Sequence, residues 1–272
     1  MTRYLFFTLL SSIIAFPSLS ATSLSSEQCL AMKKANVISE QAPLPCSRLK
    51  QVDVTFRDFS GKTQTGAIIV MDAVAHRVEM IFSALYQHQI PIQSITPIRE
   101  FFGDDEASMR ANNTSAFNAR PITGGSSWSK HAYGLAIDIN PLQNPFVEFQ
   151  ASQIVVKPPQ AAKHYLNRYS YRLGKPFRTG MAEEMVDIFA NNGFLIWGGY
   201  WNDPIDYQHF EIGPRALVNR LTAEPSKARG VFEKYIADYL SCMQLSERTP
   251  RENARAYCSA SVVEKYSHWP TQ

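Results

Sequence analysis

The sequence predicts a mixed α+β fold. Segments with the every-second-residue alternation of strands and segments with the spacing of helices both occur, in no regular strand-helix-strand order. The chain has 272 residues, of which 45% are hydrophobic and 19% charged, and it contains no internal repeat. A chain of this length and composition can bury a core, and it suits one domain with an appendage or two small domains.

Residues 1–21 have the layout of a secretory signal peptide. Arg3 is followed by an apolar stretch from Tyr4 to Phe16 and then by small residues. An uncleaved membrane anchor is the alternative, but the stretch is short for a membrane span. Cleavage is expected near Ser20 or Ala21. Because no later apolar run approaches spanning length, we expect an exported chain with no membrane span after processing.

Four cysteines fall in two close pairs, Cys29 with Cys46 and Cys242 with Cys258. Four cysteines allow three disulfide connectivities, of which local pairing needs the least loop closure. A structural zinc site is the alternative, but no Cys-x-x-Cys pair is present. Two local disulfides are therefore expected, and they fit an exported chain.

The first third of the chain predicts a tied segment, a hairpin and a helix. Residues 22–50 are polar and contain prolines, which indicates a disulfide-tied N-terminal segment. "QVDVTFRDF" at residues 51–59 alternates as a strand should, and "GAIIV" at residues 66–70 follows a turn signal. Apolar residues from Val74 to Leu85 then recur at helical spacing, so an amphipathic helix should pack on this sheet.

The middle of the chain predicts few regular elements. Residues 90–99 are interpreted as extended structure, and residues 101–127 as a long polar loop, which in compact domains is usually functional or disordered. "GLAIDIN" at residues 134–140 predicts a short strand. The proline-rich stretches "NPLQNPF" and "VVKPPQ" predict connections.

The C-terminal part predicts mostly helices. "MAEEMVDIFANNGF" at residues 181–194 gathers its apolar residues on one face and ends at an Asn-Gly stop. "YQHFEI" at residues 207–212 predicts a strand. Residues 216–245 and a last segment around Cys258 predict helices, so residues 216–272 should form a helical C-terminal extension.

The charge balance argues against a nucleic-acid partner. The chain has 27 Lys+Arg against 24 Asp+Glu, a formal net charge of only +3. Nucleic-acid binding rests largely on concentrated positive charge. We therefore expect no nucleic-acid partner.

One histidine-containing segment indicates metal chemistry. "SKHAYGLAIDIN" places His131 and Asp138 seven positions apart, and strand alternation puts Asp138 on the face opposite Ile137 and Ile139. A carboxylate in so apolar a strand has to be paired, hydrogen-bonded or bound to a metal. Zinc takes histidine nitrogen and carboxylate oxygen, and a catalytic zinc site keeps its fourth position open. An ordinary buried polar contact is the alternative.

A second segment, "IWGGYWNDPIDYQHFEI", places His209 three positions after Asp206. If His209 begins a strand and Asp206 ends the preceding turn, both face one cleft, the imidazole as ligand and the carboxylate as general base. Gly198 and Gly199, with Trp197, would bring backbone and an aromatic wall close to a ligand. A core histidine beside a surface aspartate is the alternative.

The two segments together resemble the zinc peptidases of bacterial cell walls, which include VanY-like D-alanyl-D-alanine carboxypeptidases and phage L-alanyl-D-glutamate endopeptidases. The family signature is Ser-x-His-x-x-Gly-x-x-x-Asp followed later by Asp-x-x-His, and the matching residues here are Ser129, His131, Gly134, Asp138, Asp206 and His209. The resemblance implies Zn²⁺ bound by His131, Asp138 and His209, with Asp206 as the catalytic base.

The resemblance covers roughly residues 50–213. It implies a zinc peptidase domain over residues 51–215, with an antiparallel sheet flanked by helices as in the hedgehog and DD-peptidase folds.

Several further residues are candidate substrate contacts. Stem peptides carry carboxylates and a tetrahedral intermediate carries an oxyanion, so a fixed cation is expected. Arg120 looks like the family's arginine at this place, with a catalytic and a substrate-binding role, and Arg99 is a second candidate. A surface salt bridge is the alternative for each. Ser129 and Trp197 are further substrate-binding candidates. Position 119 is Ala where the subfamily pattern "FNCR" has Cys, which removes a thiol but no ligand.

The resemblance implies an exported zinc metallopeptidase, periplasmic or secreted in a bacterium, whose partners are peptidoglycan stem peptides. It would act as a D-Ala-D-Ala carboxypeptidase or as an L-Ala-D-Glu endopeptidase. A non-catalytic, zinc-bound module that recognises peptidoglycan or a protein is the alternative, because folds are reused without turnover. A hydrolase of another amide is a third possibility. The sequence leaves open which bond is cut, which metal is loaded, what residues 216–272 do, and the oligomeric state.

Overall fold

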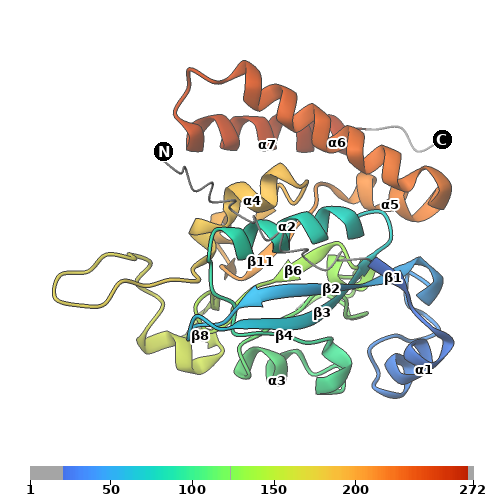
Figure 1. Cartoon of the computed structure of the whole chain (residues 1–272), viewed down its shortest axis with the longest axis horizontal. Coiled ribbons are helices and arrows are strands. Elements are labelled where there is room, and N and C mark those ends of the chain that lie inside the picture. Colours follow the sequence, from blue (N-terminus) through green and yellow to red (C-terminus); the bar gives the residue numbers. More distant parts are fainter. Residues whose placement is uncertain (1–20, 123, 269–272) are drawn as a thin grey trace, which may run out of the picture.

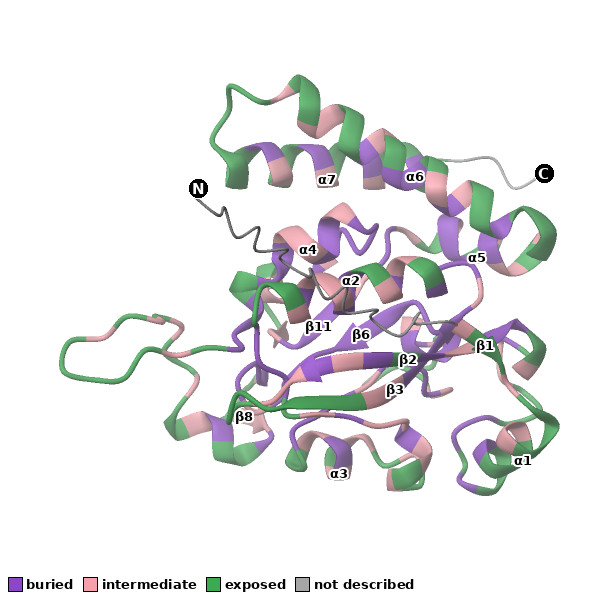
Figure 2. Cartoon of the chain, viewed as in Figure 1, coloured by how far each residue is buried: buried purple, intermediate pink, exposed green. Residues whose placement is uncertain are grey.

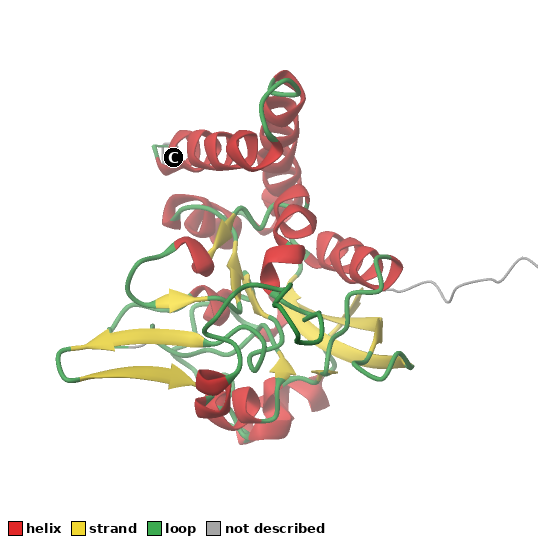
Figure 3. Cartoon of the chain, turned by 90° about the vertical axis from the view of Figure 1, so that its left-hand side faces the viewer, coloured by secondary structure: helices red, strands yellow, loops and turns green. Residues whose placement is uncertain are grey.

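The computed structural model describes residues 21–122 and 124–268. The predicted signal peptide lies outside these residues except for its last position, so it stays a prediction. Among the described residues, no helix combines the length and the apolarity that a membrane crossing requires. Helices surround short, mostly antiparallel strands (Figure 1 and Figure 3), which confirms the predicted α+β class.

A long hairpin forms the first sheet. β2 (Leu49–Arg57) pairs antiparallel with β3 (Thr63–Met71) over its whole length, and β1 (Ala21–Ser23) pairs with the other edge of β2. α2 (Ala75–Gln87) packs against this sheet through its apolar face. Buried side chains alternate along β2 as predicted: Val52, Val54 and Phe56.

A second sheet of three short strands lies behind the hairpin and carries the histidine motif. Its order is β6 (Ala136–Asp138), β11 (His209–Glu211) and β9 (Ile196–Trp197), all antiparallel. Figure 2 shows these strands among the most deeply buried parts of the chain. Side chains of this sheet are therefore held in a rigid setting.

The predicted long polar loop contains regular structure, so that prediction was wrong in part. It includes α3 (Asp105–Arg110) and β5 (Asn113–Thr114), and β5 pairs in parallel with β4 (Ser94–Ile95). The Asp104 side chain caps α3 by accepting a hydrogen bond from Ala107 N at 2.9 Å. One cap and a two-residue strand give too weak a periodic signal to be recognised in sequence.

The proline-rich stretches also differ from prediction. β7 (Phe146–Gln150) and β8 (Gln153–Lys157) form a hairpin, and β10 (Ile205–Asp206) pairs with the outer edge of β7. The prolines at positions 145 and 158 flank the two strands and do not interrupt them, which is where strands tolerate proline. The composition therefore suggested a connection where the backbone forms a sheet.

The predicted helix at residues 181–194 is shorter and divided. A 3-10 helix (Ala182–Glu184) precedes α4 (Val186–Asn191). Met181, Met185 and Phe189 are fully buried as predicted, whereas Ile188 is only half-buried.

The C-terminal extension is helical, as predicted. It consists of α5 (Arg215–Ala223), α6 (Pro225–Leu245) and α7 (Arg251–Ser267), which lie along one side of the molecule with α2 between them and β2 (Figure 1). Tyr235 and Tyr239 of α6 are fully buried.

Both predicted disulfides are present, and they join elements at the two ends. Cys29 of α1 (Ser26–Lys34) is bonded to Cys46, and Cys242 of α6 to Cys258 of α7.

The remaining helices are 3-10 turns at Cys46–Arg48, Ile98–Phe101, Lys130–Tyr133, Pro159–Lys163 and Gly198–Tyr200.

Candidate metal centre

Strand pairing brings Asp138 and His209 together from positions 71 residues apart. They are direct partners in the antiparallel register of β6 and β11. Directly opposite residues have Cβ atoms about 4.5–5.5 Å apart, so their side chains meet on one face of the sheet. Both side chains are buried, and His209 Nδ1 lies 2.9 Å from Asp138 Oδ1.

His131 reaches the same point from a 3-10 helix just before β6. Ser129 caps this helix, since its hydroxyl accepts a hydrogen bond from His131 N at 3.2 Å. Gly134 ends it with a φ of +63°, and a Cβ there would lie 2.6 Å from Met71 N. Ser129 and Gly134 of the motif therefore position His131 against β3.

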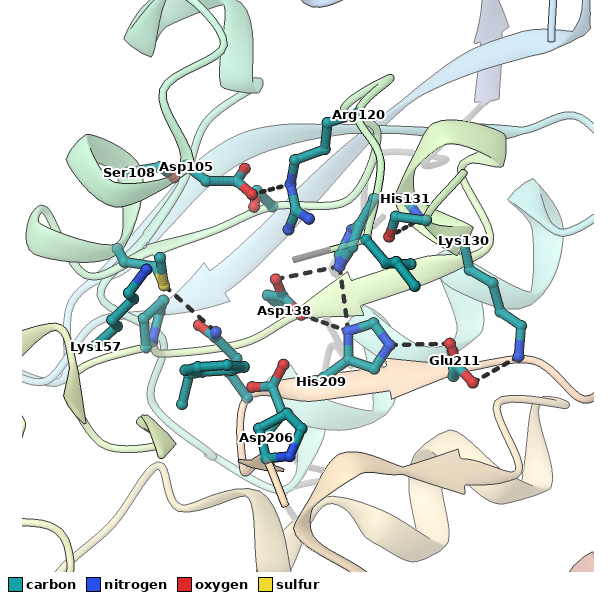
Figure 4. A pocket seen from close by; sticks show the side chains of 18 of the residues that line it. Asp105, Ser108, Arg120, Lys130, His131, Asp138, Lys157, Asp206, His209 and Glu211 are labelled. Atoms are coloured by element: carbon teal, nitrogen blue, oxygen red, sulfur yellow. Dashed lines mark hydrogen bonds and ion pairs between the residues drawn. The ribbon is translucent and has the colours of Figure 1, made fainter. Parts of the chain in front are cut away.

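The three predicted ligands converge with the spacing that a small cation needs (Figure 4). His131 Nε2 lies 3.2 Å from His209 Nδ1 and 3.2 Å from Asp138 Oδ2. Ligands about 2.0–2.2 Å from a tetrahedral zinc are separated by roughly 3.3–3.5 Å. The donor set present therefore fits a zinc-sized ion with only small adjustments.

In each imidazole, the nitrogen that points away from the ligand cluster, called the outer nitrogen here, is hydrogen-bonded to an oxygen that can only accept hydrogen bonds. His131 Nδ1 lies 2.6 Å from the carbonyl oxygen of Ala116, and His209 Nε2 lies 3.1 Å from Glu211 Oε2. Each outer nitrogen therefore donates its hydrogen, which leaves His131 Nε2 and His209 Nδ1 to face the cluster as ligand atoms. Lys130 Nζ donates to Glu211 Oε1 at 2.5 Å and holds this carboxylate in place.

Electrostatics in the cluster favour positive charge. Burial alone would lower the pKa of His209, but hydrogen bonds to Asp138 and Glu211 raise that pKa to about 10. Burial would raise the pKa of Glu211, but His209 and Lys130 hold it at about 2. Likewise His131 and His209 hold the pKa of the buried Asp138 well below its ordinary range. A metal ion can take the place of the proton that these carboxylates retain on His209.

Asp206 lies beside the cluster on β10, across His209 from Arg120 in Figure 4. Its Oδ1 atom is buried and has no hydrogen-bond partner in the part of the chain that the structure describes, and a group from a substrate could supply one. Burial, and then the charge of Asp138, raise the pKa of Asp206 to about 7. Gly198 allows this placement, because a Cβ there would lie 2.5 Å from the Asp206 carbonyl oxygen.

A cavity of about 640 Å³ opens over the cluster, and four cations line it. Three of them are paired with carboxylates: Arg120 with Asp105, Lys157 with Glu106 and Lys130 with Glu211. Among the described residues that line the cavity, Arg215 is the cation without a carboxylate partner. Its Nη2 donates to Trp128 O at 2.9 Å, and its guanidinium lies 5.5 Å from the ring centre of Tyr133.

Six of the eight predicted site residues line this cavity: Arg120, Ser129, His131, Asp138, Asp206 and His209. Arg99 and Trp197 are not among its lining residues. Arg99 forms an ion pair with Glu100 at 2.9 Å and faces a separate small hollow. Trp197 donates to Tyr207 O at 2.8 Å and stacks on Phe210, inside the core.

Sequence reasoning missed Glu211, Lys130 and Arg215. Glu211 follows His209 by two positions in a strand, which places both on one face, so the spacing alone could have indicated it. Lys130 and Arg215 give no such signal, because their proximity to the cavity depends on the tertiary fold.

The part of the chain that holds the three candidate ligands matches a known protein family. A model of the family described as D-alanyl-D-alanine carboxypeptidase matches residues 123–212. Comparison with curated proteins and with solved structures gives no match. The matched residues include Asp206 and all three predicted ligands, whereas Arg99 and Arg120 precede them. The match supports the resemblance seen in the two motifs: over residues 123–212, this chain is similar to the D-alanyl-D-alanine carboxypeptidase family.

Proposed function

We propose that this chain is a zinc-dependent peptidase that hydrolyses peptide bonds in peptidoglycan stem peptides. The observation that carries the proposal is the convergence of His131, Asp138 and His209 on one point, beside a second carboxylate, Asp206, that lines a cavity of about 640 Å³. The family match over the same residues supports it.

The residues divide the chemistry among themselves. Zn²⁺ held by the three ligands would supply Lewis-acid activation of the scissile carbonyl and of water. Asp206 would take a proton from the attacking water at its unpartnered oxygen and deliver it to the leaving amine. Glu211 and the Ala116 carbonyl keep the two imidazoles oriented throughout.

Two cations of the cavity are suited to the charge of the substrate. Arg215 has no carboxylate partner among the described residues, so a substrate carboxylate can bind it without displacing an ion pair seen there. Arg120 is held by Asp105, which fixes its guanidinium toward the cavity for the oxyanion or a second carboxylate.

We infer an exported location, periplasmic or outside a bacterial cell. Two disulfides are typical of oxidising compartments, and a cell-wall substrate lies outside the cytoplasm.

Mass spectrometry of muropeptide digests tests the function. The wild type should release fragments that Asp206→Asn does not, while Asp53→Asn, an exposed change on β2, should behave as the wild type. Loss of one terminal D-Ala would identify a carboxypeptidase, and a stem cut after L-Ala an endopeptidase.

Other outcomes would contradict the proposal. Equal cleavage by Asp206→Asn would remove this carboxylate from the mechanism. A protein that binds one equivalent of zinc and retains muropeptides uncut would be a recognition module. Cleavage of other amides but of no muropeptide would indicate a different hydrolase.

A further inference from the structure

A loop at residues 164–181, between the 3-10 helices Pro159–Lys163 and Ala182–Glu184, projects from the body of the molecule at the left of Figure 1. We propose that this projecting loop docks the protein on an anionic lipid surface. The proposal is independent of the peptidase chemistry, since no residue of the loop lines the cavity.

The base of the projecting loop is built and fixed. Arg168 forms an ion pair with Glu183 at 2.6 Å, donates to Gln143 O at 2.6 Å and lies over the ring of Tyr207. Arg178 closes the base from the other side by donating to the carbonyl oxygens of His164 and Asn167. The loop therefore has a defined attachment to the segment that carries Asp206 and His209.

The tip of the projecting loop exposes large apolar side chains. Leu173 is fully exposed, and Tyr169 and Tyr171 are 78% and 82% exposed. Phe177 is half exposed and contacts Tyr171, with ring centres 4.6 Å apart. Figure 2 shows the outer part of the loop as mostly exposed. An exposed apolar cluster of this kind usually marks an interaction site.

The charge of the projecting loop has a single sign. Residues 164–181 contain no Asp or Glu and four basic residues: Arg168, Arg172, Lys175 and Arg178. The rest of the chain then has 23 Lys+Arg, 27 less these four, against 24 Asp+Glu. The net charge of +3 is thus concentrated in the projecting loop, and a basic projection is attracted to anionic surfaces.

An aliphatic tip favours a lipid surface over a hydrated polymer. A glycan strand, a stem peptide or a nucleic acid can pair with the basic residues, but none offers Leu173 an apolar phase to enter. A bilayer interface offers anionic headgroups for Arg172 and Lys175, the headgroup level for the two tyrosines, and acyl chains for the leucine.

Vesicle binding by the purified, processed chain, without the predicted signal peptide of residues 1–21, tests the docking. The probe is a vesicle of phosphatidylglycerol and phosphatidylcholine, compared with one of phosphatidylcholine alone. We expect sedimentation with the anionic vesicles that weakens in salt, and at least tenfold weaker binding for the double variant Tyr171→Ser, Leu173→Ser. In a second measurement, the added emission of Leu173→Trp should shift to the blue on anionic vesicles, which reports tip insertion directly.

A matched control separates the loop from general stickiness. Leu245→Ser removes another leucine, 87% exposed at the end of α6, and should leave vesicle binding unchanged. Equal binding by the parent and the double variant, or an unshifted Leu173→Trp emission, would overturn the proposal. Binding to isolated peptidoglycan or to a single-stranded oligonucleotide, but not to vesicles, would also overturn it and would assign the loop to that polymer.

Discussion

Glu211 accepts a hydrogen bond from His209 on the side of the ring that faces away from the ligand cluster, at 3.1 Å. A neutral amide at this position would polarise the imidazole less and would leave Lys130, whose side chain is only 10% exposed, without its counter-charge. We expect Glu211→Gln to lower zinc affinity about 10- to 100-fold. Competition against a fluorescent chelator measures this directly.

The matched control for Glu211→Gln is Glu264→Gln, an exposed change on α7 that should leave zinc affinity unaltered. Unchanged zinc affinity in Glu211→Gln would mean that this carboxylate does not position the ligand.

Zinc uptake should release a proton. Against the effect of burial, hydrogen bonds to Asp138 and Glu211 raise the pKa of His209 to about 10, so this ring carries an extra proton below that pH, and a metal must displace it. Zinc affinity should therefore increase with pH, by about tenfold per unit for one proton released, and should level off near the raised pKa. Calorimetric titration in buffers of different ionisation enthalpy counts the protons, and a count of zero would contradict the prediction.

Substrate binding should depend on Arg215. Arg215→Met removes the cavity cation for which residues 21–122 and 124–268 supply no carboxylate partner, at a cost of about 1.5–3 kcal/mol for a charged hydrogen bond, or roughly 10- to 100-fold. We expect KM for stem peptides to rise by that factor with kcat nearly unchanged, because the contact binds substrate and transition state alike.

The control for Arg215→Met is Arg229→Met, an exposed cation on α6 that should leave both constants as in the wild type. An unchanged KM for Arg215→Met would assign the substrate carboxylate to another cation.

The C-terminal disulfide should stabilise the helical extension. Cys242–Cys258 closes a loop with a sequence separation of 16 between α6 and α7. Replacing both cysteines by serine should lower the free energy of unfolding by about 2–4 kcal/mol, chiefly because the unfolded chain gains freedom. Urea denaturation measures the difference, and an equal midpoint and slope in the variant would contradict the expectation.

Elements that are encoded by the periodicity of consecutive residues could be predicted from the sequence. The alternation of β2 and the spacing of α2 are written in consecutive residues, and the structure follows both. The hairpin of β7 and β8 was missed because prolines at its ends looked like those of a connection. α3 was missed because its six residues are too few to show a helical periodicity in the sequence.

The candidate site divides in the same way. His131, Asp138, Asp206 and His209 stand in two short motifs, so their presence could be recognised before their geometry was known. Arg99 was chosen for its residue type and its place in the sequence, and the folded chain directs it toward Glu100. Arg215 could not be found, because only the packing of α5 beside the 3-10 helix of His131 brings it to the cavity.

The three candidate metal ligands come together only when β6 and β11 pair in the register seen in the structure. Their two imidazoles are 78 residues apart, and a slip of one position would turn His209 to the opposite side of the sheet. An unfolded chain therefore presents no assembled trio of donors, and tight capture of an ion has to follow completion of the fold. A chain threaded through a membrane before folding would consequently take up its ion from the compartment it enters, and not from the one where it was made.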